Sequence, residues 1–237
     1  MTIAIMQPYL FPYIGYFQLM NAVDEFIVYD NIEFTKKGWI NRNRILVNGL
    51  AAYISFPLKK DSDYLQVKDR YLADNWPEER KKLRNKIAEV YRKAPQFKSA
   101  FPVIESAIEF PNNNLFTFAL HSLETIKNYL AIQTPIIISS TIDIDHSLKS
   151  ADKVIAICKK RNAEEYINPI GGTDLYNKEE FLNNGLSLHF LKTGEVHYKQ
   201  FENEFVPFLS IIDVMMFNSK EEIKNHIENS YKLVDGA

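Results

Sequence analysis

The sequence predicts an α/β fold with a mostly parallel sheet that opens with a β-loop-α-β unit, and with a helical middle segment. The first observation is an apolar run that ends at Met6, followed by a helix beginning near Ile14 and a second apolar run over 25–29. The second is the helical spacing of apolar residues through 74–130. The third is the β-branched run within 135–139, which predicts a buried, parallel strand.

Composition bounds the number of domains and the kinds of partner. With 237 residues and 46% hydrophobic content, the chain can bury a sizeable core. We expect one α/β domain over 1–237, with a mostly helical insertion at about 74–130. The net charge is −2, with 28 basic and 30 acidic residues mixed along the chain, which argues against nucleic acid as a partner.

The cysteine content and the start of the chain indicate the compartment. The one cysteine, Cys158, excludes an internal disulfide and a cysteine-rich zinc site, which fits a reducing cytosol. Met1 leads directly into the first strand without a basic leader, and no long uninterrupted apolar run occurs. The sequence therefore predicts a cytoplasmic protein with no membrane span.

The loop after the first strand combines a stiff backbone with polar aromatic side chains. Pro8 and Pro12 lack backbone donors and fix φ near about −65°. The loop displays Gln7, Tyr9, Tyr13 and Tyr16. Because the loop after the first strand of such a unit usually faces a ligand, we expect these side chains to line a cleft.

A second polar patch follows the second strand. Asp30 and Asn31 come directly after it. A mixed cationic, amide and aromatic segment follows, and it contains Lys36, Lys37, Trp39, Asn41, Arg42, Asn43 and Arg44. Aromatic clusters are most often core, but amide and guanidinium groups cannot be buried without partners. We therefore favour a ligand cleft over core packing. The basic segment either binds a phosphate group or only meets solvent, and both interpretations stay open.

The chain from 45 to 130 is expected to form a hairpin and three helices. Asn48-Gly49 supplies the positive φ of a type I′ turn and predicts a hairpin over 45–56. Helices are expected from about 75, over 101–108 and over 115–130.

Three groups able to ligate a metal follow the strand at 135–139, namely Asp143, Asp145 and His146. Turn and cap chemistry before a helix at 151–161 is the favoured interpretation, so we expect no metal site. A loop over 169–173 with Gly171 and Gly172 offers backbone amides to an anion, but it lacks the P-loop lysine and a full dinucleotide fingerprint.

The last part of the chain, from 186 onward, is expected to form one strand and two helices. It contains a strand over 186–191, a buried helix over 207–217, an amphipathic helix over 220–231, and disorder only at 234–237. Asp213 falls in the buried helix and must have a hydrogen-bonding partner there.

Several motifs together resemble the WbqC-like family over essentially the full chain. They are MQPYLFPYIGYFQL at the start, Tyr29-Asp30-Asn31, Trp39-Ile40-Asn41-Arg42-Asn43, Tyr166-x-x-Pro169-x-Gly171 with Tyr176, and Tyr198-x-Gln200 with Leu209-Ser210-Ile211-Ile212-Asp213 and Asn218. The resemblance implies a bacterial protein of O-antigen and other surface-polysaccharide gene clusters. It implies a role in attaching a glycyl or similar acyl group to a nucleotide-linked amino sugar, and it supplies no catalytic residues.

The order of elements at the start of the chain also resembles nucleotidylyltransferase-like α/β folds. Those enzymes carry His-x-Gly-His in the first loop, whereas this loop reads Pro12-Tyr13-Ile14-Gly15-Tyr16 without histidine. The fold analogy therefore does not extend to adenylation chemistry.

The favoured function is a transferase with a nucleotide-sugar and an unknown acyl donor as substrates, and with no cofactor. Arg42 would hold the diphosphate, Tyr9, Tyr13 and Trp39 would stack on sugar or base, and Gln7 and Asn43 would polarise the acyl carbonyl. Asp30 is the candidate base, with His197 as runner-up. The remaining expected binding residues are Asn41, Gly171, Gly172, Tyr176 and Gln200.

Two other functions remain. The chain contains no recognisable nucleophile, metal set or cofactor fingerprint, which favours a non-catalytic binding or scaffold protein of the same pathway. A metal-dependent hydrolase using Asp143, Asp145 and His146 ranks below both. A homo-oligomer stays open.

Overall fold

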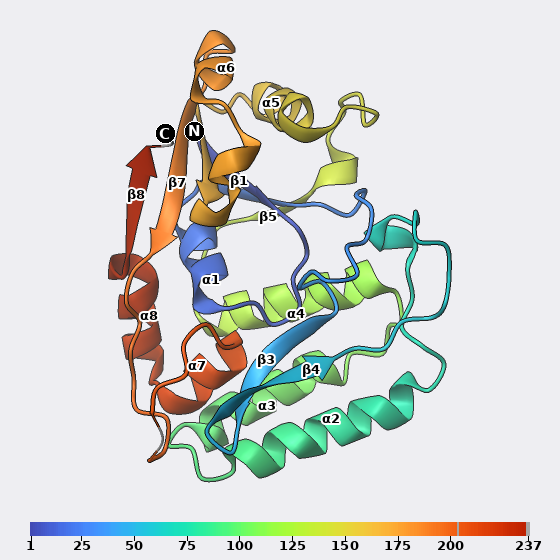
Figure 1. The fold of residues 1–237 in the computed structure, drawn as a ribbon, viewed down its shortest axis with the longest axis vertical. Coiled ribbons are helices and arrows are strands. Elements are labelled where there is room, and N and C mark those ends of the chain that lie inside the picture. The colour runs from blue at the N-terminus through green and yellow to red at the C-terminus, as the bar shows by residue number, and fades with distance from the viewer. Residues whose placement is uncertain (203, 236–237) are drawn as a thin grey trace.

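Six strands form the central sheet of the computed structural model, which describes residues 1–202 and 204–235 (Figure 1). Their order across the sheet is β5-β2-β1-β6-β7-β8; the first five run parallel, and β8 runs antiparallel to β7. The expected α/β fold with a mostly parallel sheet is confirmed. The strands are β1 (Thr2–Met6), β2 (Glu25–Val28), β5 (Ile136–Ile138), β6 (Glu165–Pro169), β7 (Ser187–Thr193) and β8 (Tyr231–Asp235).

Helices cover both faces of this sheet because its strands are apolar on both sides. Ile3 and Ile5 belong to one apolar layer, whereas Ala4 between them belongs to the other, as the two-residue period of a strand requires. The first layer is completed by α5 and α6, and the second by α1 and α8. These helices are α1 (Ile14–Asn21), α5 (Ser150–Lys160), α6 (Lys178–Asn183) and α8 (Lys220–Asn229).

The direction in which strands are added to the sheet reverses at β1. From β1 the chain moves to β2 and β5 on one side, and then returns to place β6 and β7 on the other. Residues Met6 and Val28 are register partners, so the loops that follow β1 and β2 leave the same edge of the sheet. In open α/β sheets, the crevice outside the carboxyl ends of the strands at such a reversal is where ligands bind.

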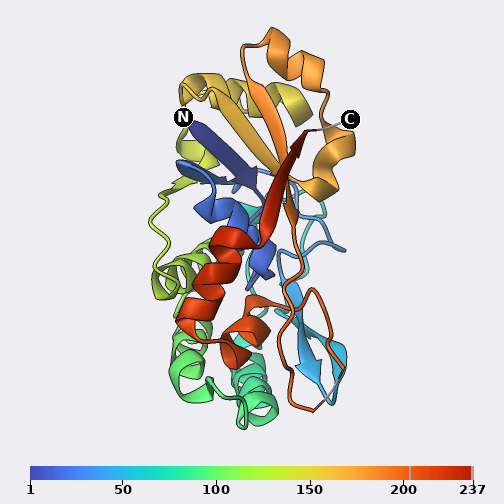
Figure 2. The ribbon, with the colours of Figure 1, turned by 90° about the vertical axis from the view of Figure 1, so that its left-hand side faces the viewer.

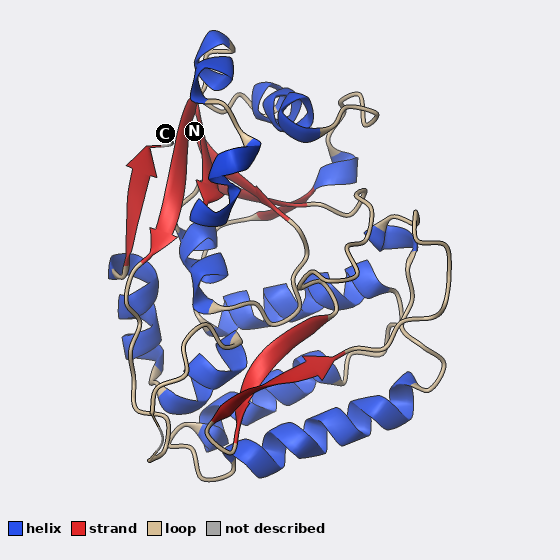
Figure 3. Ribbon diagram, viewed as in Figure 1, coloured by secondary structure: helices blue, strands red, loops and turns tan. Residues whose placement is uncertain are grey.

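A hairpin and three helices form the other end of the molecule (Figures 1 and 3). The hairpin turns at Asn48 (φ 51°) and Gly49 (φ 76°), as the sequence predicts. Phe56 packs its ring 5.2 Å from Trp76 and 5.7 Å from Phe118, which joins the hairpin to the helices. The elements are β3 (Arg42–Val47), β4 (Leu50–Ser55), α2 (Trp76–Tyr91), α3 (Phe97–Ile108) and α4 (Leu115–Tyr129).

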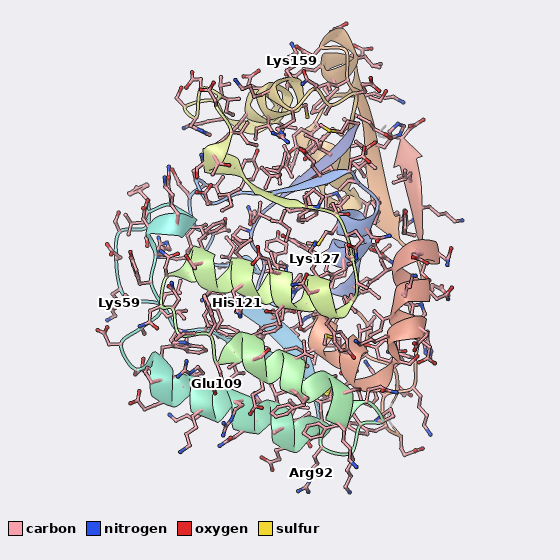
Figure 4. All side chains as sticks on the ribbon, turned by 180° about the vertical axis from the view of Figure 1, so that it is seen from behind. Lys59, Arg92, Glu109, His121, Lys127 and Lys159 are labelled. Carbon is pink, nitrogen blue, oxygen red and sulfur yellow. The ribbon has the colours of Figure 1, made fainter. Side chains whose placement is uncertain are left out.

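Those three helices turn their charged side chains away from the hairpin. Seen from behind, Glu109 and Arg92 lie at the ends of α3 and α2, and Lys127 lies on α4 (Figure 4). The ring of His121 stacks on Phe110 at 3.9 Å. This face therefore carries the solvated side of amphipathic helices.

Three expectations about secondary structure need correction. Strand β5 is half-buried rather than buried, because it lies at the sheet edge and pairs only with β2. The buried helix expected over 207–217 begins only at Ile211, as α7 (Ile211–Phe217). The end of the chain pairs with β7 as β8, seen in front in Figure 2. The disorder expected at 234–237 is thus wrong for Val234 and Asp235, and residues 236–237 lie outside the described part.

Across the described ranges, 1–202 and 204–235, no helix is both long and apolar enough to cross a membrane.

Candidate functional site

A cleft of about 570 Å³ opens where β1 and β6 end. It lies at the point where the strand order reverses, between Gln7 after β1 and Asn168 at the end of β6. Side chains from the hairpin and from the 3₁₀ segment Ile170–Leu175 complete its walls. The sequence-predicted binding residues that line it are Gln7, Tyr9, Tyr13, Trp39, Asn43, Gly171, Gly172 and Tyr176.

Three hydrogen bonds from two side chains hold the aromatic loop in place. Tyr16 is buried outside the cleft lining, and its hydroxyl donates to the Gln7 carbonyl oxygen at 2.9 Å. The buried Asn43 donates its amide to the carbonyl oxygens of Leu10 (3.1 Å) and Phe11 (2.8 Å). Phe11 has a φ of 43°, in the left-handed region that few non-glycine residues adopt, so these bonds hold a strained turn. Asn43 therefore positions the loop, and its amide protons are already used.

Tyr13 closes one end of the cleft. Its hydroxyl shares a hydrogen bond with the Thr193 side chain at the end of β7, and burial raises the pKa of this tyrosine. A Cβ atom at Gly15 would collide with both Tyr13 and Thr193. Glycine at position 15 is thus what allows the ring to fold back over the start of α1.

Arg44 supplies a cation to the cleft. Its guanidinium carbon lies 5.5 Å from the Trp39 ring centroid, and Nη2 donates to the Phe208 carbonyl oxygen at 3.2 Å. Its Nε is buried and finds no hydrogen-bond partner in the described part of the chain. An unpaired buried donor is costly, so an acceptor brought by a ligand would be stabilising at this position.

The opposite wall belongs to β6 and the turn after it. Tyr166 donates its hydroxyl to Asn168 Oδ1 at 3.1 Å. A Cβ atom at Gly172 would collide with the Asn168 amide, so glycine makes room for that side chain. Tyr176 packs edge-on against Tyr166 at 5.7 Å and completes the wall.

The ionisable lining groups of the cleft divide into neutral hydroxyls, Arg44 and one carboxyl. Burial raises the pKa values of Tyr9, Tyr29 and Tyr176 above their usual range, so all three are neutral donors at neutral pH. Glu33 is the one carboxyl among the described lining residues; it is exposed, and it pairs by an isolated β-bridge with Gln66.

Two predicted hairpin residues lie outside the lining of this cleft. Arg42 donates to the carbonyl oxygens of Gly38 (3.0 Å) and Lys37 (2.5 Å), and stacks over Tyr53 at 5.1 Å. Asn41 donates to the Phe56 carbonyl oxygen at 2.9 Å. Both side chains therefore support the hairpin and its entry.

Asp30 also lies outside the cleft lining. Its Oδ1 accepts hydrogen bonds from the Ser139 hydroxyl (3.0 Å) and the Ser140 amide (2.9 Å). The neighbouring Asn31 binds Ser139 and the ring of His146. This buried carboxylate thus ties the end of β2 to the segment after β5.

Gln200 and His197 also lie outside the cleft lining. Gln200 donates to Asp213 Oδ2 at 2.7 Å, and the hydroxyls of Tyr91 and Tyr198 donate to the same carboxyl at 2.7 Å each. This set supplies the partners that a buried Asp213 requires. His197 is exposed, with its ring 4.3 Å from Phe205, and does not line the cleft.

Other residues that line the cleft had no binding role assigned from the sequence, among them Arg44, Glu33, Tyr29, Asn168 and Phe208. Arg44 had a sequence signal, because it belongs to the predicted cationic patch and lies two positions after Arg42 on β3. Phe208 had none, since it reaches the cleft only through tertiary packing.

The described residues hold no group of three or more metal-ligating side chains. Asp143 pairs with Lys160 at 2.8 Å, and Asp145 accepts from the backbone and hydroxyl of Ser147. The Asp145 contacts are turn chemistry, whereas the Asp143 contact is an ion pair with α5.

Comparison with known proteins gives a family and one relative. Residues 7–225 match the WbqC-like protein family. The chain is 27% identical over 239 residues to "Uncharacterized protein Rv1507c" of Mycobacterium tuberculosis, an alignment that covers 95% of this chain and 96% of that protein. No solved structure matches.

Proposed function

Because the chain belongs to the WbqC-like protein family, we propose that it is a transferase that acylates the amine of a nucleotide-linked amino sugar in surface-polysaccharide biosynthesis, such as that of O-antigen. The cleft at the strand reversal is the proposed substrate site. The observation that carries the proposal is Arg44, whose guanidinium lies against Trp39 inside this cleft with a buried Nε still unpaired.

The chemistry of the walls supports a nucleotide-sugar. A guanidinium offers a planar fork of donors that matches phosphate oxygens, so Arg44 is the proposed diphosphate ligand. Tyr9, Tyr13 and Trp39 offer flat faces for a sugar or a base. The cleft volume of about 570 Å³ lies within the usual range for small-molecule sites.

The reaction requires a base. The sugar ammonium must lose one proton before its nitrogen attacks the acyl carbonyl carbon; the new C–N bond then forms as the leaving group departs with the electron pair of the broken bond. Glu33 is the carboxyl on the cleft wall and is the proposed base. This assignment replaces Asp30, whose Oδ1 is engaged by Ser139 and Ser140.

A non-catalytic ligand-binding or scaffold protein of the same pathway is the second candidate. The observation that favours it is the chemistry of the cleft lining, which among the described residues includes no serine, cysteine or histidine. Such a site binds without supplying a nucleophile of its own.

A thermal-shift panel tests the proposal. Purified protein is melted with nucleotide-linked amino sugars, their neutral-sugar analogues and free nucleotides. A ligand that binds only the native state raises the melting temperature. The expected result is stabilisation by a nucleotide-amino sugar, followed by a mass increase of that sugar when an acyl donor is added. Binding without any mass increase, across a full set of donors, would favour the second candidate.

A further inference from the structure

A second hollow, of about 520 Å³, lies on the other side of Tyr13 and Phe208. Its walls come from the end of β7 with the segment that follows, and from the segment that leads into α7. Tyr13 and Phe208 line this hollow and the cleft alike. The two spaces therefore share one boundary made of two aromatic rings.

The two spaces differ in chemistry. The floor of the second hollow consists of Ile14, Leu209 and Val214, each at most 5% exposed. Its lining also includes the hydroxyls of Thr193 and Tyr198, whereas Lys192, Glu195 and His197 are exposed. The cleft presents amides, a guanidinium and hydroxyls instead. A ligand group that fits the second hollow is therefore apolar and uncharged.

The shared boundary has one fixed ring and one exposed ring. Tyr13 is bound to Thr193, whereas the Phe208 side chain is 67% exposed and its φ is 56°. A non-glycine residue in the left-handed region persists only where its surroundings hold it. Here the Phe208 carbonyl is bound by Arg44, the cation of the cleft. One residue thus forms part of both walls.

We propose that the second hollow binds the acyl chain of an acyl thioester, the donor for the transfer proposed above, on which this inference rests. The acyl carbonyl lies at the Tyr13–Phe208 boundary and meets the sugar amine from the cleft. The amine nitrogen attacks the carbonyl carbon, the C–N bond forms, and the C–S bond breaks. Sulfur takes the electron pair of that bond and the proton given up by nitrogen, so an amide and a free thiol result.

The choice of a thioester follows from charge. An acyl phosphate or acyl adenylate would bring an anionic leaving group to the Tyr13–Phe208 boundary. The lysine and arginine side chains that line the two spaces are Arg44, which the sugar diphosphate takes in this proposal, and Lys192, which is exposed. A thioester sulfur is neutral and needs no ion partner there. The apolar floor also selects a hydrocarbon chain rather than a small glycyl group, because only a chain fills it.

The test uses acyl-pantetheine thioesters with chains of two, four, six and eight carbons, and calorimetry on the full chain. Burial of about 0.8 kcal/mol per methylene corresponds to roughly fourfold in affinity, so each two-carbon step is expected to tighten binding more than tenfold until the hollow is full. Val196→Asp places a carboxylate on the half-buried wall and is expected to abolish this dependence. Val196→Ala is expected to weaken it only mildly.

Leu50→Asp is the matched control, because Leu50 is an exposed apolar residue that lines neither space. It is expected to keep the full chain-length dependence. Affinity that does not change with chain length, or an unchanged dependence in Val196→Asp, would overturn the assignment. The thermal shift caused by a nucleotide-amino sugar is measured in the same variants. If the sugar still stabilises the protein but the chain-length test fails, the donor site is refuted and the proposed function stands.

One more arm separates the sources of the thioester. A coenzyme A thioester of the eight-carbon chain that binds as tightly as the pantetheine thioester identifies a free thioester as the donor. If the pantetheine thioester binds and the coenzyme A thioester does not, the donor is one held on a carrier protein. Either result supports the hollow as the acyl subsite.

Discussion

The guanidinium of Arg44 donates a 3.2 Å hydrogen bond to the backbone carbonyl oxygen of Phe208. This contact joins strand β3 to a residue 164 positions later and brings the C-terminal segment to the rim of the cleft. The backbone of Ser210 donates to the Arg44 carbonyl oxygen at 2.9 Å and repeats the link. The site is therefore assembled from both ends of the chain.

Replacing Phe208 with alanine separates binding from stability. Because the ring is 67% exposed, the free energy of unfolding is expected to change by no more than about 0.5 kcal/mol. Loss of an aromatic face is expected to weaken nucleotide-amino sugar binding by about two- to tenfold. Calorimetry checks this, with Leu182→Ala, an exposed residue outside the cleft, as the control. Equal affinities in both variants would remove Phe208 from the site.

Asn43→Ala tests whether this amide holds the aromatic loop. The change leaves the Leu10 and Phe11 carbonyl oxygens without its hydrogen bonds in a buried setting. The free energy of unfolding is expected to fall by about 2–4 kcal/mol, as for two weakened buried polar groups. Urea unfolding measures it, against Asn183→Ala on the exposed end of α6. A loss no larger than in that control would show that the loop holds its shape without Asn43.

The first loop and the hairpin show what sequence can predict at this site. The β-loop-α-β unit is encoded locally, so Gln7, Tyr9 and Tyr13 fall where the strand end places them. The choice between Arg42 and Arg44 is different, because both occupy one strand and only the tertiary packing of the hairpin decides which side chain reaches the cleft.

Longer-range contacts account for the remaining differences. Asp30 follows a strand end, as expected of a site residue, but hydrogen bonds from Ser139 and Ser140, about 110 positions away, engage its Oδ1. Phe208 reaches the cleft through Arg44, and no local pattern encodes that pairing. The edge position of β5 and the pairing of β8 depend on the order of the whole sheet.

Asp213 is expected to make stability depend on pH. Burial raises the pKa of its carboxyl above the usual range, although hydrogen bonds from Tyr198, Tyr91 and Gln200 oppose this. The folded state therefore keeps a proton that the unfolded state releases, so the contribution to stability is full below the unfolded pKa and declines as pH rises through the folded one.

Urea unfolding of wild type and Asp213→Asn between pH 4 and 7 isolates this effect. As pH rises, the free energy of unfolding of wild type is expected to fall relative to that of Asp213→Asn. The fall is at most about 1.4 kcal/mol per pH unit for one proton. A constant difference across this range would refute the expectation.

Glu33→Gln tests the proposed base. Turnover of the acyl transfer is expected to fall by about 10²- to 10⁴-fold, the usual contribution of a positioned base, while nucleotide-amino sugar affinity stays unchanged. Steady-state kinetics and calorimetry on the same preparation report both values. Asp30→Asn serves as the comparison. Because Asp30 lies outside the cleft lining, this change is expected to lower the stability of the protein rather than its turnover. Full activity in Glu33→Gln would exclude the role.

The most direct test of the central claim is the affinity of wild type, Arg44→Ala and Arg42→Ala for the nucleotide-amino sugar that stabilises the protein. Both arginines lie on β3 and stack near Trp39, but only Arg44 lines the cleft. Loss of a charged hydrogen bond is expected to weaken binding about tenfold to a hundredfold in Arg44→Ala. Arg42→Ala is expected to stay within about threefold, the size of one exposed cation–π contact. Equal losses in the two variants, or none in Arg44→Ala, would contradict the cleft as the nucleotide-sugar site.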